Sequence, residues 1–172
     1  NDKIIGHNTD IDGFELAIKD ANYDVEGKKV LILGAGGVVP SVIFALYKMK
    51  VLSVTVSNRT KTKAKNLKTS FNDLKIIDWG EASSFDMIIN ATSIGLKKED
   101  KLNLDFSKFQ NCEFFYDVIY NPKETNFLRD GKSLGKKTEN GKKMFIYQAA
   151  KSFKIWHGVE PKINEQVIRL LD

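Results

Sequence analysis

The 172-residue chain is poor in the residues that form covalent or metal cross-links, because it has one cysteine and two histidines. Cys112 has no partner for a disulfide within the chain, and it lies in an apolar run typical of a buried strand. A lone core thiol is typical of a reducing compartment, so we expect a cytoplasmic protein. His7 and His157 lie far apart and no CxxC pair occurs, so we expect no metal site.

No apolar run approaches the length of about 18 residues that a membrane span needs, and no signal peptide is recognisable, so we expect no membrane association. The net charge of +5 admits an anionic partner. The two lysine clusters, at residues 61–68 and 136–143, lack the interleaved aromatic residues of nucleic-acid binders, so we expect no nucleic-acid partner. The sequence starts with Asn rather than Met, and we expect it to be a piece of a longer protein.

Apolar segments typical of strands alternate with segments that have the apolar periodicity of helices. Predicted strands span residues 30–33, 52–58, 74–77, 85–92 and 112–119, and predicted helices span 13–22, 37–50, 61–71, 142–155 and 160–171, with another starting at 125. Most of these strands are apolar on both faces, which favours a parallel sheet covered on both sides. We therefore expect a single α/β domain, with a doubly wound, mostly parallel, Rossmann-like sheet and helices on both faces. Three further segments are predicted as a strand (1–10), a surface loop (94–108) and a mobile loop rich in Gly and Lys (131–143).

The segment VLILGAGGVV, residues 30–39, joins a predicted buried strand to a predicted helix through three glycines. In dinucleotide-binding folds the first glycine makes the turn and the second lets the backbone approach a pyrophosphate, which lies at the helix N-terminus. Gly34 and Gly36 fill these two positions, whereas the third holds Val39, and Gly37 restores some room. The loop therefore predicts a dinucleotide site, and the alternative is a tight turn without a ligand.

The end of the second predicted strand carries no acidic residue, although NAD-binding folds place one there to hold the ribose 2′-hydroxyl. Asn58, Arg59 and Thr60 stand there instead, followed by Lys61 and Lys63. Cations at this position suit a 2′-phosphate, so we expect NADP rather than NAD. A charge-assisted contact of this kind is worth roughly 1.5 to 3 kcal/mol, or about 10- to 150-fold in affinity. The alternative is a solvated basic helix start.

Six short motifs occur in one order: NTD (8–10), GAGG (34–37), NRT (58–60), NATSIG (90–95), YDVIYNP (116–122) and QAA (148–150). Together they resemble the cofactor-binding half of the shikimate dehydrogenase family, and the resemblance covers nearly the whole chain. The family reduces 3-dehydroshikimate to shikimate with NADPH, on the route to aromatic amino acids, in a cleft between two domains. The resemblance implies that the N-terminal substrate domain and its lysine are absent from this sequence, and that residues 1–25 connect to that domain.

The resemblance also implies a role for individual residues. Asp10 would be the catalytic residue that pairs with the absent lysine, because an aspartate of ordinary pKa, near 3.9, is a poor proton donor at neutral pH. The residues implied to bind the substrate are Asn8, Thr9, Tyr120 and Gln148. The residues implied to bind the cofactor are Gly34, Ala35, Gly36, Gly37, Val38, Asn58, Arg59, Thr60, Lys63, Asn90, Ala91, Thr92, Ser93, Ile119 and Gly141. The family usually has Arg where Lys63 stands, and lysine keeps the charge without the bidentate fork.

Other interpretations of these residues stay open. Asp10 or Asp12 could cap the helix expected near residue 13, Tyr120 could pack on the next helix, and Gln148 could be solvated. The chain could belong to a quinate or shikimate dehydrogenase of relaxed cofactor use, or it could be a dinucleotide sensor without chemistry. Convergence of Asp10, Tyr120 and Gln148 would argue for an enzyme. Asp117 is expected to orient the loop before Tyr120, and the isolated fragment is expected to bind NADP without turning over.

Overall fold

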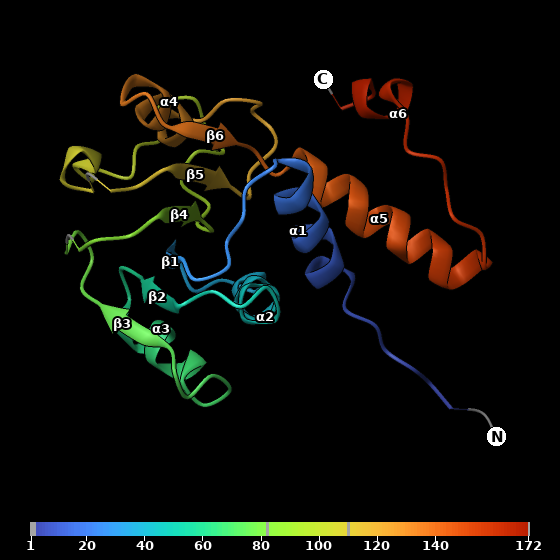
Figure 1. The fold of residues 1–172 in the computed structure, drawn as a ribbon, viewed down its shortest axis with the longest axis horizontal. Helices are drawn as coiled ribbons and strands as arrows, with labels where there is room; N and C mark the ends of the chain where they lie inside the picture. The colour runs from blue at the N-terminus through green and yellow to red at the C-terminus, as the bar shows by residue number, and fades with distance from the viewer. Residues whose placement is uncertain (1–2, 82, 110, 172) are drawn as a thin grey trace.

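The computed structural model describes residues 3–81, 83–109 and 111–171, and its centre is a sheet of six strands (Figure 1). The strands are β1 (Lys29–Leu33), β2 (Ser53–Ser57), β3 (Lys75–Ile77), β4 (Met87–Asn90), β5 (Phe114–Asp117) and β6 (Lys137–Glu139). Their spatial order is β3-β2-β1-β4-β5-β6, and each of the five pairings that join them is parallel. This is the order of dinucleotide-binding sheets, which confirms the predicted Rossmann-like fold.

Helical elements connect the strands. They are α1 (Thr9–Asp20), α2 (Val39–Lys48), α3 (Lys61–Leu67), the 3-10 turn η1 (Phe106–Lys108), α4 (Asn126–Ser133), α5 (Lys142–His157) and α6 (Glu165–Arg169). Pro40 lies in the first turn of α2, where its missing N–H removes no helical hydrogen bond. Gly158 ends α5 in the left-handed conformation that glycine adopts without strain. No helix among the described residues has the length and apolar character to cross a bilayer.

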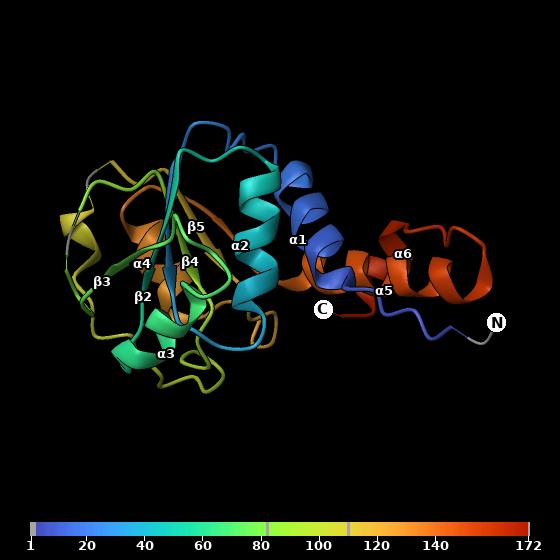
Figure 2. The same cartoon turned by 90° about the horizontal axis from the view of Figure 1, so that it is seen from below.

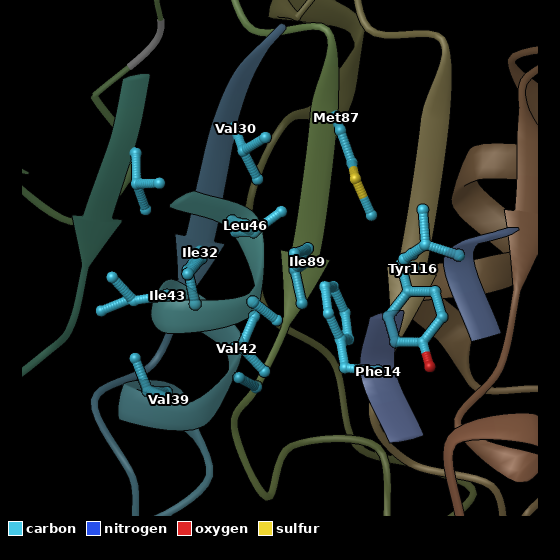
Figure 3. Packing of buried hydrophobic residues seen from close by; sticks show 14 of the residues in the cluster. Phe14, Val30, Ile32, Val39, Val42, Ile43, Leu46, Met87, Ile89 and Tyr116 are labelled. Carbon is cyan, nitrogen blue, oxygen red and sulfur yellow. The ribbon is translucent and has the colours of Figure 1, made fainter. Parts of the chain in front are cut away.

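The sheet has an apolar layer on each face because neighbouring residues of a strand point in opposite directions. Val30 and Ile32 of β1 pack with α1, α2 and α5 on one face, and Figure 3 shows side chains of α2 directed at β1 and β4. Leu31 and Leu33 pack on the other face with α4 and η1. Figure 2 shows α1 and α2 on one side of the sheet and α4 on the other, which confirms that helices cover both faces. Cys112 is a free, buried thiol, and burial raises its pKa to about 11, so it is an inert core residue.

Helices α1 and α5 pack closely because the contact point on α1 is a glycine. A Cβ placed on Gly13 would lie 2.8 Å from both Gln148 Cβ and the Met144 carbonyl oxygen. Figure 1 shows this pair beside the sheet, with the second half of α5 running out beyond it. The close contact brings the start of α1, which carries the motif NTD, next to the middle of α5.

Several predicted boundaries are wrong. Residues 3–8 have no regular structure instead of forming a strand, and the first helix begins at Thr9 instead of residue 13. The segment 131–143, predicted as a mobile loop, holds the end of α4, all of β6 and the start of α5. Its strand carries polar side chains at the sheet edge, so it has no apolar signal. The last helix is limited to α6, and the predicted surface loop 94–108 contains η1 and buries Leu102 and Phe106.

We expect Gly13→Ala to lower the free energy of unfolding by about 1 kcal/mol, measured by urea denaturation. Alanine favours a helix over glycine by about 1 kcal/mol, but overpacking at a tight contact costs about 1–3 kcal/mol. Gly37→Ala is the control, because an added Cβ there has no atom within 4 Å, and a change below about 0.5 kcal/mol is expected. A Gly13→Ala variant more stable than the wild type by about 1 kcal/mol, as helix propensity alone would give, would contradict the close α1–α5 contact.

Candidate functional site

The loops after β1 and β4 meet at the centre of the sheet, where the strand order reverses. β1 and β4 are neighbours in the sheet, but their chains continue to opposite sides, which opens a crevice at the carboxyl ends of the strands. Gly34 has a φ of +111°, and a Cβ there would lie 2.6 Å from the Ala91 carbonyl oxygen. Only glycine accommodates both the conformation and the contact, so Gly34 makes the turn that the sequence predicts.

The N-terminus of α2 follows this turn with exposed backbone. Gly36 and Gly37 are exposed, and no side chain caps the helix at its N-cap, Val38. The Val39 N–H donates to the Gly36 carbonyl oxygen, and Pro40 has no N–H. The N–H groups of Gly36 and Gly37, just before the helix, are therefore the ones available to an anion, which the helix dipole also favours. Val39, the departure from the glycine fingerprint, is fully buried in the core. Its side chain therefore points away from the surface on which a pyrophosphate would lie.

A pocket of about 610 Å³ opens in front of this loop. Among the residues predicted to bind a cofactor, it is lined by Gly34, Ala35, Gly36, Asn58, Arg59, Thr60, Lys63, Ala91, Thr92 and Ser93. The structure thus brings together three motifs that are well separated in the sequence. Gly37, Val38, Asn90, Ile119 and Gly141 were also predicted to bind the cofactor, but they do not line this pocket.

The pocket is positively charged. Arg59, Lys63 and Lys101 are among its lining residues, and no acidic residue is, within the part of the chain that the structure describes. Lys61, the third cation expected at the end of β2, does not line the pocket and instead pairs with Asp78 at 2.5 Å. The Asn58 side chain donates to the Thr60 carbonyl oxygen at 2.8 Å and so orders the basic loop. The pocket therefore fits an anion, because the glycine loop before α2 and three cationic side chains line it together.

Five pocket residues were not predicted from the sequence: Trp79, Ile94, Lys101, Leu102 and Asn103. All but Trp79 belong to the segment after β4, which was predicted as a surface loop. The signal that could have located this segment is its apolar residues, because Leu102 and Phe106 are both buried against the second face of the sheet. Burial of these two side chains fixes the segment against the sheet and so holds its neighbouring polar residues in place.

A second group of predicted residues gathers where α1 meets α5. The Thr9 hydroxyl donates to Gln148 Oε1 at 3.4 Å. It also forms a hydrogen bond with the Ser152 hydroxyl, with the two oxygens 3.0 Å apart. Asn8 caps α1, because its Oδ1 accepts from the Asp10 N–H at 3.1 Å. The helix cap is therefore neither Asp10 nor Asp12. Asn8 Nδ2 also donates to Ser41 of α2 at 2.9 Å, which links this group to the glycine-loop helix.

Tyr120 joins the same group through α5. Its ring stacks on Phe145 with centroids 4.8 Å apart, and Gln148 donates to the Phe145 carbonyl oxygen at 3.1 Å. Tyr120 therefore packs on a helix, but that helix is α5 and not the next one along the chain, α4, which one of the open interpretations had expected. Its hydroxyl makes no hydrogen bond within the described part of the chain. Thr9, Gln148 and Tyr120 therefore border one region, with Asp10 in the first turn of α1 beside it. The roles of these residues in binding a substrate stay predictions.

Gly141 and Ile119 lie between the two groups. A Cβ on Gly141 would overlap the Val118 carbonyl oxygen, and its N–H donates to the Ile119 carbonyl oxygen at 3.1 Å. Glycine is thus needed there for a close backbone contact. Ile119 is buried, and its side chain would lie 3.2 Å from a Cβ on Gly95 of the loop after β4. The predicted contact of both residues with a cofactor stays a prediction.

The last residue of β5, Asp117, is a fully buried carboxylate. It accepts hydrogen bonds from Asn90, Thr125 and the Ile119 N–H, and each of these donors is uncharged. Burial raises the pKa of Asp117 to about 6, although the three donors oppose this shift. The charged form of Asp117 therefore costs stability in the folded protein.

The titration of Asp117 predicts a pH dependence of stability with a definite sign. Its folded-state pKa lies above its unfolded value of about 3.9, so the folded protein gains stability as the pH falls through 6. Between pH 7 and pH 5 we expect the free energy of unfolding of the wild type to rise by about 1 kcal/mol relative to Asp117→Asn. Urea denaturation of both proteins at both pH values measures this difference. The other titrating groups contribute equally to the free energy of unfolding of both proteins, so their contributions cancel. An identical difference at the two pH values would show that Asp117 does not titrate in this range.

Comparison with known proteins assigns the chain to a family. The model described as "Shikimate / quinate 5-dehydrogenase" matches residues 15–108, and that described as "Shikimate 5'-dehydrogenase C-terminal domain" matches residues 143–168. Shikimate dehydrogenase (NADP(+)) from Pelagibacter ubique is 55% identical over 172 residues, which cover 100% of this chain and 65% of the relative. The enzyme of the same name from Caldicellulosiruptor saccharolyticus is 42% identical, over 92% of this chain and 60% of the relative. The chain thus spans about three fifths of the length of the curated relatives it matches.

Solved structures agree with this assignment. Shikimate 5-dehydrogenase from Thermus thermophilus, in complex with NADP(H) and shikimate, superposes with a TM-score of 0.85 at 33% identity, over 97% of this chain and 64% of that one. Quinate dehydrogenase from Corynebacterium glutamicum, in complex with NAD, superposes with a TM-score of 0.85 at 28% identity, over 96% of this chain and 62% of that one. The sequence and the fold are thus those of a known group, and the chain belongs to the shikimate/quinate 5-dehydrogenase family.

Proposed function

We propose that this chain is the NADP(H)-binding part of an oxidoreductase that reduces 3-dehydroshikimate to shikimate by hydride transfer, in the biosynthesis of aromatic amino acids. The observation that carries the proposal is the charge of the pocket. Arg59 and Lys63 line it at the end of β2, and no carboxylate among the described lining residues stands there to hold a ribose 2′-hydroxyl. This arrangement favours a 2′-phosphate, and hence NADP over NAD.

The described residues fit NADP along the length of the pocket. The turn at Gly34 and the backbone N–H groups of Gly36 and Gly37, just before α2, would hold the pyrophosphate. Arg59 and Lys63 would hold the 2′-phosphate, with Arg59 able to donate two parallel hydrogen bonds. Thr92 and Ser93, which also line the pocket, would contact the cofactor. When bound, NADPH supplies the hydride, and this chain's residues orient it and exclude water.

The group at the α1–α5 contact would serve the substrate. Asp10 would hold the positive charge of a lysine supplied by the rest of the protein, and this pairing would keep the lysine protonated and aligned as the proton donor. The Tyr120 hydroxyl and the Gln148 amide would donate to or accept from the hydroxyl and carboxyl groups of the ring acid. A sensor without chemistry would have no use for this second group, so its presence beside the dinucleotide pocket favours an enzyme.

A quinate or shikimate dehydrogenase of relaxed cofactor use is the second candidate. It is favoured by the family relatives that were solved with NAD, from Corynebacterium glutamicum and Listeria monocytogenes. Lys63 bears on this choice, because a lysine ammonium is a point charge without the fork of arginine. The preference for NADP should therefore rest mainly on Arg59.

Calorimetric titration with NADP and, separately, NAD tests the cofactor assignment. We expect the wild type to prefer NADP by about tenfold or more, and Arg59→Ala to lose about 10- to 150-fold in NADP affinity while its NAD affinity changes by less than about threefold. Lys61→Ala is the matched control, because Lys61 is a neighbouring cation that pairs with Asp78 and does not line the pocket. Equal affinity of the wild type for the two dinucleotides would favour relaxed cofactor use. Binding of neither would refute the dinucleotide site in this chain.

The substrate assignment needs the full-length protein. We expect the full-length enzyme to oxidise NADPH in the presence of 3-dehydroshikimate, whereas this chain alone binds NADPH without turnover. In the full-length enzyme, Asp10→Asn should lower kcat by about 10²- to 10⁴-fold and leave the NADPH dissociation constant unchanged. Absorbance at the NADPH band measures turnover. Normal turnover by this chain alone would show that no group outside it is required.

A further inference from the structure

Asp117 lies where three segments of the second half of the sheet meet. It ends β5, while Asn90 ends the neighbouring strand β4, and the two residues are paired in the register of the sheet. Thr125, the N-cap of α4, supplies the third contact. The Thr125 hydroxyl donates to Asp117 Oδ2 at 2.6 Å, and the Asn90 amide donates to both carboxylate oxygens at 3.1 and 3.2 Å.

The carboxylate sets the direction of a chain of hydrogen bonds. An ionised carboxylate only accepts, so Asn90 must turn its NH₂ group towards Asp117 and its Oδ1 away. Asn90 Oδ1 then accepts from the Thr92 N–H at 3.1 Å and from the Thr92 hydroxyl at 2.8 Å. Because the Thr92 hydroxyl has directed its proton to Asn90, its oxygen accepts from the Ile94 N–H at 3.0 Å. We call this series, from Asp117 through Asn90 and Thr92 to Ile94, the Asp117 relay.

The Asp117 relay holds the wall of the dinucleotide pocket. Thr92 and Ile94 both line the pocket, and Ala91 between the relay residues contacts Gly34 across the crevice. The same carboxylate accepts from the Ile119 N–H at 3.0 Å, one residue before Tyr120. One buried group therefore fixes the loop after β4 and the loop after β5 relative to each other.

The geometry points to a positioning role for Asp117, and this inference rests on the proposed function: we propose that its carboxylate fixes the orientation of Asn90, so that residues 91–94 form the wall that binds NADP. This role requires a hydrogen-bond acceptor at both oxygen positions of residue 117. A side chain of the right size alone does not meet the requirement. The amide of the Asp117→Asn variant has nearly the same shape, but its NH₂ group must replace one of two oxygens that lie 3.1 and 3.2 Å from Asn90 Nδ2, which is a donor. Either Asn90 turns round and abandons Thr92, or two donors face each other.

The cost of the carboxylate makes the substitution informative. A buried charge that is held by uncharged donors lowers the stability of the fold, so its replacement by an amide is expected to leave a folded protein. A role in packing alone would then leave NADP binding intact. A positioning role would weaken NADP binding in a protein that is still folded.

The test measures NADP affinity by calorimetry and amide hydrogen exchange by NMR in the protein without ligand. Exchange is followed at Thr92, Ile94 and Ile119, whose N–H groups all donate to side chains of this network. For Asp117→Asn we expect an NADP dissociation constant raised about tenfold or more and exchange at these three amides accelerated about tenfold or more, as the loss of a buried hydrogen bond implies. Thr125→Val should raise the dissociation constant by a smaller factor of about threefold or more, and Thr125→Ser, which keeps the hydroxyl, should restore the wild-type value.

Asp86→Asn is the matched control. Asp86 precedes β4 at the end opposite Asn90, and its Oδ2 accepts from the Lys29 N–H at 2.7 Å. The same chemical change there should leave the NADP dissociation constant and the three exchange rates within about threefold of the wild type. A loss of affinity in this control would assign the effect to general destabilisation and would overturn the positioning role.

Two results would overturn the inference directly. A folded Asp117→Asn variant with unchanged exchange at the three amides would show that the carboxylate does not set the relay. Faster exchange with unchanged NADP affinity would show that the relay does not serve the cofactor. If Asp117→Asn does not fold, equal affinity of Thr125→Val and Thr125→Ser overturns the inference. If the wild type binds neither NADP nor NAD, the proposed function fails, and the exchange rates alone decide whether Asp117 sets the relay.

Discussion

The contact between Gly34 and the Ala91 carbonyl oxygen is the constraint on which the rest of the site depends. It joins the loops after the two central strands, and a side chain at Gly34 would push them apart. Because the strand order reverses here, the loops on either side diverge and leave the crevice in which the basic residues after β2 and the polar residues after β4 face each other. The sheet could form with wider loops, but the pocket could not keep this shape.

Polar groups at the carboxyl ends of the strands turn this shape into a defined site. Ser57 at the end of β2 donates to the Asp78 carbonyl oxygen at 3.0 Å and accepts, through its own carbonyl oxygen, from the Gly34 N–H at 2.8 Å. Asn90 and Asp117 make the corresponding link between β4 and β5. A hydrophobic group in place of Asp117 would avoid the cost of a buried charge, but it would give Asn90 no preferred orientation. Stability and the precision of the site therefore make opposite demands at this position.

The sequence predicts the parts of the fold and site that have a local signal. The apolar strands, the helix after the glycine loop and the basic residues Arg59 and Lys63 each follow from residue type and spacing, and the structure places them as expected. The edge strand β6 was missed because its polar side chains resemble a loop. Trp79 and Lys101 were missed because they reach the pocket through long-range packing, which no short motif records. The start of α1 was misplaced because Gly13 looks like a helix boundary, whereas it serves the contact with α5.

The pocket and the group of residues around α5 are linked by the side chain of Asn8, at the start of α1. Under the proposed function, hydride transfer would need the donor and the acceptor to be held at a fixed separation. Asn8 caps the helix that carries Asp10 and also donates to Ser41 of α2, the helix that follows the glycine loop. The Gly13 contact locks the same helix against α5 and Gln148. Any displacement of α1 would therefore move Asp10 relative to both groups at once, which explains why this helix is fixed at a polar and an apolar contact.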